Sequence, residues 1–187
     1  MANTGQPVPI ANLTLSSSQA YVQFSSIPQG FAHLYLEYKV SSSNTTGNVA
    51  VLVNFNNDTT GSNYSYWTVQ GFGSAGNSAY GTADSSFFGL CTTSTSAANA
   101  YAANTAHIPL YSATNKYKSS YVDATSVNNS NETKFYEKTY NLWKSTSAIN
   151  TIKLTCAVGN FMSGSTFTLY GVNNTVTNGS GTATTTP

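Results

Sequence analysis

Charged residues are scarce in this sequence. Of its 187 residues, seven are basic and six are acidic, whereas charged residues make up about a quarter of an average soluble domain. All seven basic residues are Lys, because Arg does not occur. With a net charge of +1 and no guanidinium group, the chain lacks the basic surface that binds phosphate groups. We therefore expect neither nucleic acid nor an anionic membrane as a partner.

Long hydrophobic runs are also missing. No stretch of about 18 or more apolar residues, the minimum for a membrane-spanning helix, occurs in the sequence. The first residues contain neither a basic leader nor an apolar segment of signal-peptide length. We therefore expect no signal peptide and synthesis in the cytoplasm of the producing cell.

Only two cysteines are present, Cys91 and Cys156. They permit one disulfide or none, and their spacing matches no zinc motif. Cys156 lies in the alternating segment 152–158 and shares a face with Ile152 and Leu154, which predicts a small buried residue. We favour two free thiols. A disulfide stays open if the fold brings the two residues within about 7 Å.

Catalytic groups are few. The chain has two His and six acidic residues, and neither His33 nor His107 has a second metal ligand at a suitable spacing, so both are interpreted as structural histidines. No phosphate-binding loop, serine-nucleophile motif or zinc-protease motif occurs. We expect no metal, no cofactor and no enzymatic activity. A weak glycan hydrolase using scattered carboxylates such as Asp58 and Asp84 is the least favoured alternative.

Small neutral polar residues and aromatic residues dominate instead, with 26 Ser, 27 Thr, 21 Asn and 13 Tyr. Apolar and polar residues alternate along most of the chain, and no segment keeps a helical spacing. The clearest strand covers residues 31–40, with the even-numbered residues from Leu34 to Val40 pointing inward. Further strands are predicted at 10–15, 20–24, 49–55, 64–70, 117–124, 135–142, 149–158 and 165–172. The pattern predicts an all-β fold, an antiparallel β-sandwich of jelly-roll type with eight or nine strands.

Residues 54–61, NFNNDTTG, form a cluster of turn-forming residues between two of these strands. The cluster has the oxygen-rich composition of a calcium loop, but the glycine and glutamate positions of such a loop are not filled. We predict a type I turn here, with Asn and Asp side chains as caps.

We expect a single domain over residues 10–172 with an extended segment at each end. Two prolines, Pro7 and Pro9, keep the arm 1–9 extended, and it is expected to lie on a surface or to reach a neighbouring subunit. Residues 71–106 are mostly small and polar and are predicted to form a long loop whose large apolar side chains pack on the domain or on a partner. The tail 173–187 is expected to be flexible.

The aromatic residues have two competing interpretations. Asn63, Tyr64, Tyr66 and Trp67 suit a stacking platform with an amide clamp for a sugar. Aromatic residues also fill the space between sheets that are poor in Leu and Ile, and Tyr is favoured at protein–protein contacts. We favour the structural interpretation.

Three stretches together resemble one group of proteins. They are residues 24–34 (FSSIPQGFAHL), 54–64 (NFNNDTTGSNY) and 164–172 (GSTFTLYGV). In these stretches the chain resembles small β-sandwich virion proteins of tailed bacteriophages, which occur as capsid decoration (cement) proteins or as modules of tails and fibres. The resemblance implies a fold and a virion setting and assigns no functional residue. The lack of Arg after residue 38 and the long segment 71–106 depart from the family pattern.

From this resemblance we expect a structural virion protein on the capsid surface, a decoration protein that self-associates as a trimer and stabilises contacts between subunits of the major capsid protein. The candidate contact residues are Pro7, Val8, Pro9, Tyr80, Phe87, Phe88 and Tyr101. The alternative is a receptor-binding tail module that recognises host glycans through Asn63, Tyr64, Tyr66 and Trp67. Low charge favours association in either case, because a neutral polar surface has little self-repulsion.

Overall fold

The computed structural model describes residues 6–45, 47, 49–72, 75–82, 86–96, 100–127 and 134–173. These residues form twelve strands and one short 3₁₀ turn, with no α-helix among them, so the predicted all-β class is confirmed. The elements are β1 (Val8–Thr14), β2 (Tyr21–Phe24), β3 (His33–Ser42), β4 (Val49–Phe55), η1 (Gly61–Asn63), β5 (Tyr64–Phe72), β6 (Ala75–Thr82), β7 (Ser86–Thr93), β8 (Ala102–Pro109), β9 (Lys118–Val127), β10 (Lys134–Trp143), β11 (Ile152–Cys156) and β12 (Thr166–Val172).

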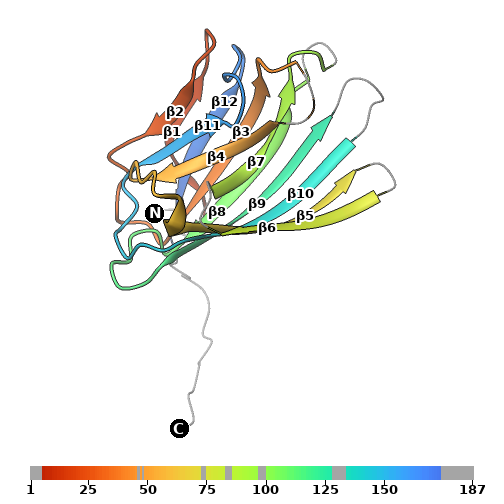
Figure 1. Cartoon of the computed structure of the whole chain (residues 1–187). Helices are drawn as coiled ribbons and strands as arrows, with labels where there is room; N and C mark the ends of the chain where they lie inside the picture. The colour runs from red at the N-terminus through yellow and green to blue at the C-terminus, as the bar shows by residue number, and fades with distance from the viewer. Residues whose placement is uncertain are drawn as a thin grey trace.

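The strands pair in two groups, which we call the long sheet and the short sheet. The long sheet has the order β1-β12-β3-β8-β9-β10-β5-β6, and the short sheet has the order β2-β11-β4-β7. Pairing within each is antiparallel, and the two join where β3 runs parallel to β7 over Ser41–Thr92 and Ser42–Thr93. Figure 1 shows the short sheet near β3 and β12, with β9, β10, β5 and β6 extending away. Twelve strands exceed the eight or nine predicted, and the jelly-roll topology stays a prediction.

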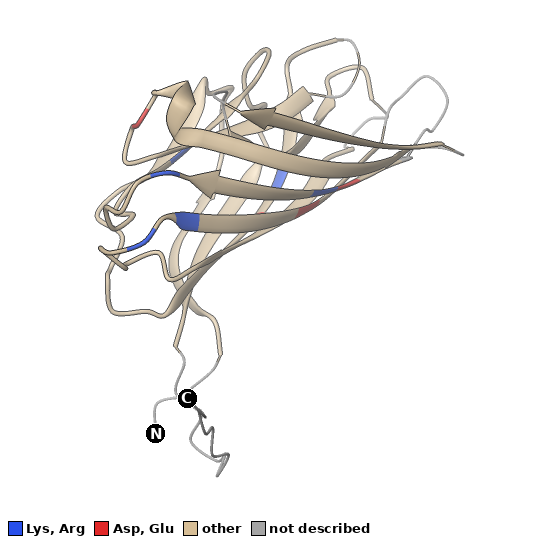
Figure 2. Ribbon diagram, turned by 60° about the horizontal axis from the view of Figure 1, so that its bottom comes forward, with Lys and Arg blue, Asp and Glu red and all other residues tan. Residues whose placement is uncertain are grey.

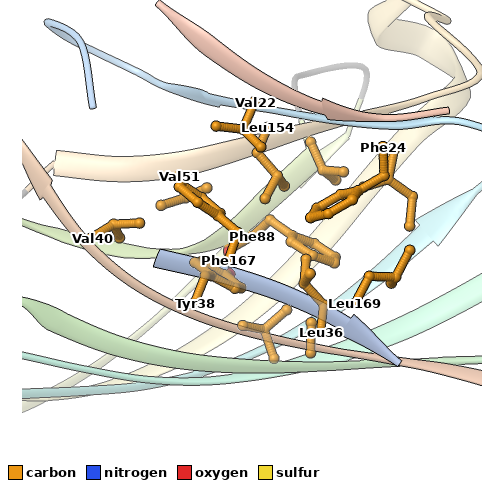
Figure 3. Close-up of a cluster of buried hydrophobic side chains, with 14 of the residues drawn as sticks. Val22, Phe24, Leu36, Tyr38, Val40, Val51, Phe88, Leu154, Phe167 and Leu169 are labelled. Carbon is orange, nitrogen blue, oxygen red and sulfur yellow. Dashed lines mark hydrogen bonds between the residues drawn. The ribbon is translucent and has the colours of Figure 1, made fainter. Parts of the chain in front are cut away.

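The main hydrophobic core lies between the two sheets. Figure 3 shows its side chains, among them Val22, Val51 and Leu154 of the short sheet and Leu36, Tyr38 and Phe167 of the long sheet. The inward face predicted for residues 31–40 is confirmed, since the even-numbered residues from Leu34 to Val40 are at most 1% exposed. Burial of such side chains is the main favourable contribution to folding.

The segment 71–106 is not the long loop that its composition predicted. It contains β6, β7 and the start of β8, and β7 is buried along most of its length. The prediction was wrong because it relied on the low strand propensity of residues such as Gly, Ala and Asn. In the structure the backbones of these residues pair with neighbouring strands, and their small side chains allow neighbouring strands to approach closely. The nine strands predicted from the sequence are all present, with ends shifted by a few residues.

The middle of β7 requires a glycine. Gly89 has a φ of 110°, which other residues rarely adopt. A Cβ there would lie 2.7 Å from the Tyr38 hydroxyl and would overlap the Asn104 amide oxygen. Asn104 needs this place, because its Oδ1 accepts from the N–H of Leu90 at 2.8 Å and its Nδ2 donates to the Leu90 carbonyl at 2.9 Å. Gly89 thus allows a side chain of β8 to hold β7 against the long sheet.

The turn after β4 differs in type from the prediction. Asn56 and Asn57 have φ values of 52° and 56°, and the Asp58 N–H donates to the Phe55 carbonyl at 2.9 Å. Positive φ at both central residues makes this a type I′ turn. It closes no hairpin, because β4 pairs with β11 and β7 whereas β5 pairs with β10 and β6. Asn accepts this conformation more readily than most residues.

Asp58 connects this turn to β10. Its Oδ2 accepts from Trp143 Nε1 and from Asn63 Nδ2, both at 2.8 Å, and its Oδ1 accepts from the Thr60 N–H at 2.9 Å. Partial burial works to raise the pKa of Asp58, but these hydrogen bonds outweigh it and the pKa is lowered. A carboxylate held in this way is a structural anion.

The two ends of the chain are described only in part. Val8 and Pro9 of the predicted arm belong to β1 and pair with Gly171 and Tyr170 of β12, so this part of the arm is a sheet edge. Residues 1–5 of the arm and 174–187 of the tail lie outside the described residues. Among the described residues, no helix is long and apolar enough to span a membrane.

Candidate functional site

The candidate site is the surface of the long sheet that points away from the core, which we call the outer face. On β3 it is formed by Tyr35, Glu37 and Lys39, which alternate with the buried core residues. Lys, Asp and Glu occupy only short stretches of the long strands in Figure 2. The outer face is therefore formed mostly by uncharged side chains.

A continuous line of aromatic rings crosses this face. Each ring-bearing residue lies directly opposite the next one on the neighbouring strand. At a strand spacing of about 4.8 Å, seven neighbouring strands give a line roughly 29 Å long. We call this line the aromatic row; from β12 to β6 it consists of Tyr170, Tyr35, His107, Tyr121, Tyr140, Trp67 and Tyr80.

Much of the aromatic row is open to solvent. The exposed fraction is 77% for Tyr80, 48% for Trp67, 46% for Tyr140 and 41% for Tyr121. Neighbouring rings contact one another, with centroids 5.8 Å apart for Trp67 and Tyr140 and 4.9 Å apart for His107 and Tyr121. Ring contacts of this kind are favourable and restrict the side chains. The row is thus an ordered aromatic surface that no layer of the described residues covers.

The two histidines lie together on the outer face. Their ring centroids are 5.2 Å apart, although the two residues are far apart in the sequence. Burial, with a smaller contribution from His33, lowers the pKa of His107. His107 is therefore neutral at pH 7 and contributes a ring to the row without a charge.

The charged residues beside the row largely compensate one another. Lys138 Nζ lies 3.1 Å from Asp123 Oδ1, and the Tyr136 hydroxyl donates to the same oxygen at 2.9 Å. The hydrogen bonds to Asp123 raise the pKa of Lys138 and that of Tyr136. A depression of about 400 Å³ lies beside the row on the outer face. Its lining includes Glu37, Lys39, Thr105, Asp123 and Thr125.

The four residues predicted for a sugar platform do not form one surface. Tyr64 is buried, and its hydroxyl donates to the Asp58 carbonyl at 3.0 Å. Tyr66 packs on Phe87 at a ring distance of 5.5 Å, and Asn63 binds Asp58. Only Trp67 lies on the outer face. Neighbouring strand residues alternate between faces, which separates Tyr66 from Trp67.

The predicted protein-contact residues also separate. Tyr80 is on the outer face, and Val8 and Pro9 lie on the edge strand β1. Phe88 is completely buried and packs on Tyr38 and Phe55, so it is a core residue and not a contact. Phe87 and Tyr101 are half-buried, and Tyr101 donates to the Ser163 carbonyl at 3.1 Å. Pro7 precedes β1 and is exposed.

A second polar group lies on the inner side of β10. Glu137 is 1% exposed, and its carboxylate accepts from Gln70 at 2.6 Å and from Thr139 at 3.0 Å. Burial raises the pKa of Glu137, and the two hydrogen bonds only partly oppose this effect. A cavity of about 310 Å³ lined by Phe87, Phe135 and Glu137 adjoins the group. Because its oxygens are bonded to Gln70 on the neighbouring strand β5 and to Thr139 on β10 itself, we interpret Glu137 as structural.

The two cysteines are both buried and carry free thiols, as predicted. Their sulfur atoms lie 3.4 Å apart. Burial raises the pKa of the Cys91 thiol, with smaller contributions from Cys156. The Cys91 thiol is thus protonated at neutral pH and unreactive.

Within the described ranges, no group of three or more His, Cys, Asp or Glu side chains is arranged to hold a metal ion. No known family model, curated protein or solved structure matches the chain. The aromatic row is therefore the structural feature on which a proposal for function rests.

Proposed function

We propose that this chain is a structural protein that binds other protein subunits through the aromatic row, in the virion setting that the sequence resemblance implies. The observation that carries the proposal is the unbroken line of seven rings on an exposed sheet face. Single exposed aromatic residues are ordinary on a protein surface, whereas an aligned and contiguous group indicates a binding surface.

The size of the row suits a protein contact. An aromatic side chain buries about 150–250 Å² when it is fully covered. The four most exposed rings, which are 41–77% accessible, therefore present on the order of 400 Å². A standard interface buries about 800 Å² per partner, so these rings supply about half of one side. Tyr and Trp are also enriched among the residues that contribute most binding energy.

The charge distribution supports the same proposal. Two acidic residues, Glu37 and Asp123, and two basic residues, Lys39 and Lys138, lie beside the row, so the charges of these four residues balance. Such a face repels neither copies of itself nor a neutral partner. In the proposed role the chain decorates a capsid, self-associates and rests on the major capsid protein through the outer face.

Glycan binding is the second candidate function, and one observation favours it. The depression of about 400 Å³ places hydroxyl, carboxylate and ammonium groups directly beside a linear aromatic row. Aromatic rings stack on sugar faces, and neighbouring polar groups bind the sugar hydroxyls. In this case Trp67 and Tyr140 would contact a linear polysaccharide.

One pair of variants separates these candidates. Trp67→Ala combined with Tyr140→Ala removes two neighbouring exposed rings of the aromatic row, and Ser119→Ala changes an exposed outer-face residue outside it. Gold-labelled protein is added to virus particles from the natural source, and capsid occupancy is counted by electron microscopy. The same proteins are applied to a glycan array.

We expect the wild type and Ser119→Ala to label the capsid surface. The double variant should bind the capsid at least tenfold more weakly, which corresponds to a loss of about 1.4 kcal/mol in binding free energy. Equal occupancy by the double variant would contradict the proposal. Array binding that the double variant loses, together with an absence of capsid labelling by any of the proteins, would establish the glycan alternative.

A further inference from the structure

The edges of the two sheets are protected to different degrees. Among the described strands, β1, β2 and β6 each pair with one neighbour only, and β7 is covered by other strands along its unpaired side. An unprotected edge offers unpaired N–H and C=O groups to any other strand, so proteins usually shorten, bend or charge their edges.

Two of the three edges carry such protection. In β1, Pro9 has no N–H to donate, and the register with β12 shifts between Pro9 and Ala11. The edge strand β2 is only four residues long, Tyr21–Phe24. Both features prevent the addition of a further strand over any length.

The third edge, β6, has none of these protections. It runs for eight residues, Ala75–Thr82, and pairs with β5 in an unbroken register. Its sequence AGNSAYGT contains no charge and no proline, and every residue except Gly81 is exposed. About half of its backbone N–H and C=O groups point away from β5, as in any antiparallel edge strand.

We infer that β6 is a self-association strand, which pairs antiparallel with β6 of a second copy of this chain. The inference rests on the proposed function, since self-association is part of it. Each copy presents the same edge, and antiparallel pairing of identical strands closes around a two-fold axis. The product is a dimer with one continuous sheet, in place of the trimer expected from the sequence resemblance.

Three features favour a second copy as the occupant. No charged residue lies on β5 or β6, so like charges do not oppose the pairing of identical edges. Ser78 and Ala79 at the centre are small and allow close approach of two backbones. Tyr80 is the terminal ring of the aromatic row and its most exposed member, and antiparallel pairing puts the Tyr80 rings of both copies on the same outer face. The aromatic rows of both copies then lie on one continuous outer face.

The experiment places a charge in the middle of the edge. Ser78→Lys brings two lysines together across the two-fold axis, and lysine is a residue that proteins use to block edges. Ser119→Lys is the matched control, because it makes the same exchange at an exposed serine of β9, an interior strand. Molar mass is measured by sedimentation velocity over a range of concentrations.

We expect dimers of the wild type and of Ser119→Lys, and at least a tenfold higher dimer dissociation constant for Ser78→Lys. An equimolar mixture of Ser78→Lys and Ser78→Glu should recover the dimer, because opposite charges then face each other. A monomeric wild type, an unchanged Ser78→Lys dimer or failure of the mixture to recover would each overturn the inference. Capsid binding by monomeric Ser78→Lys would show that the outer face acts without the edge, so the two proposals can fail separately.

Discussion

The two halves of the long sheet use their faces in opposite ways. On β3 the inner face is apolar, with Leu36 and Val40 completely buried. On β10 the inner face carries Glu137 and Thr139, both buried, while Tyr140 of the outer face is 46% exposed. The usual rule that apolar residues point inward holds for β3 and is reversed in the middle of β10.

The reversal has a physical explanation on each side of β10. The buried polar groups bond to one another, since the Thr139 hydroxyl donates to Glu137 at 3.0 Å and lies 3.2 Å from the Thr68 hydroxyl, and bonded polar groups are tolerated in an interior. The exposed rings of the outer face are not buried when the chain folds, so they do not contribute the stabilisation that burial would give. Their position therefore points to a partner, whereas the β3 side of the sheet is explained by folding alone.

The largest expected effect is in the apolar core that packs against the β3 half of the long sheet. Phe88→Ala should lower the free energy of unfolding by about 3–5 kcal/mol, the usual cost of removing a fully buried ring, because Phe88 contacts the rings of Tyr38 and Phe55. Urea denaturation followed by tryptophan fluorescence measures this loss. A loss below about 1 kcal/mol would mean that Phe88 is a contact residue, as the sequence suggested, and would remove the distinction between the halves.

An intermediate effect, dependent on pH, is expected in the polar half. Burial raises the folded-state pKa of Glu137 above its ordinary value, so the folded state favours the protonated carboxyl. The contribution of Glu137 to stability is fully present below its unfolded pKa of about 4.3 and is lost as the pH rises through its folded pKa. Glu137→Gln should therefore raise Tm by a few degrees at pH 7 and leave it unchanged near pH 4.

Calorimetry at pH 4, 5, 6 and 7 tests this expectation. Asp58→Asn is the contrasting variant, because the pKa of Asp58 is lowered in the folded state. The contribution of Asp58 to stability is therefore present above about pH 3.9 and is lost as the pH falls through the folded pKa. A Tm difference for Glu137→Gln that does not vary with pH would refute the assignment of Glu137 as a buried titrating group.

The smallest effect on stability is expected on the outer face. Tyr140→Ser should change the free energy of unfolding by no more than about 0.5 kcal/mol, as is usual for exposed positions, although Tyr140 belongs to the aromatic row. The same denaturation experiment measures it, with Ser119→Ala as the reference. A loss above about 2 kcal/mol would show that the row stabilises the chain itself and weaken the argument for a partner.

Particular residues show how far the sequence predicts this fold. The alternation at Leu34 to Val40 correctly identified both the strand and its faces, because side chains in a strand alternate with period two. The strand β6 was missed, since AGNSAYGT carries no apolar period and only its pairing with β5 makes it a strand. The type I′ turn at Asn56 and Asn57 was missed because Asn occurs in both turn types.

Only two members of the candidate site, Trp67 and Tyr80, were predicted from the sequence. Tyr35, Tyr121 and Tyr170 belong to strands that are distant in the sequence, so nothing local relates them to Trp67. A partial signal was present in β3, where Tyr35 lies between two inward leucines and must point outward. The same argument gives no result for β10, whose inner face is polar.

The sequence by itself determined the all-β class, the low charge of every surface and most of the strands, because these properties depend on composition and on neighbouring residues. The tertiary structure decided the rest. The register between strands far apart in the chain aligns seven rings into one row and pairs the two histidines. It also leaves β6 at an unprotected edge. Register depends on long-range backbone pairing, and a shift of one residue would have sent each ring to the other face of the sheet.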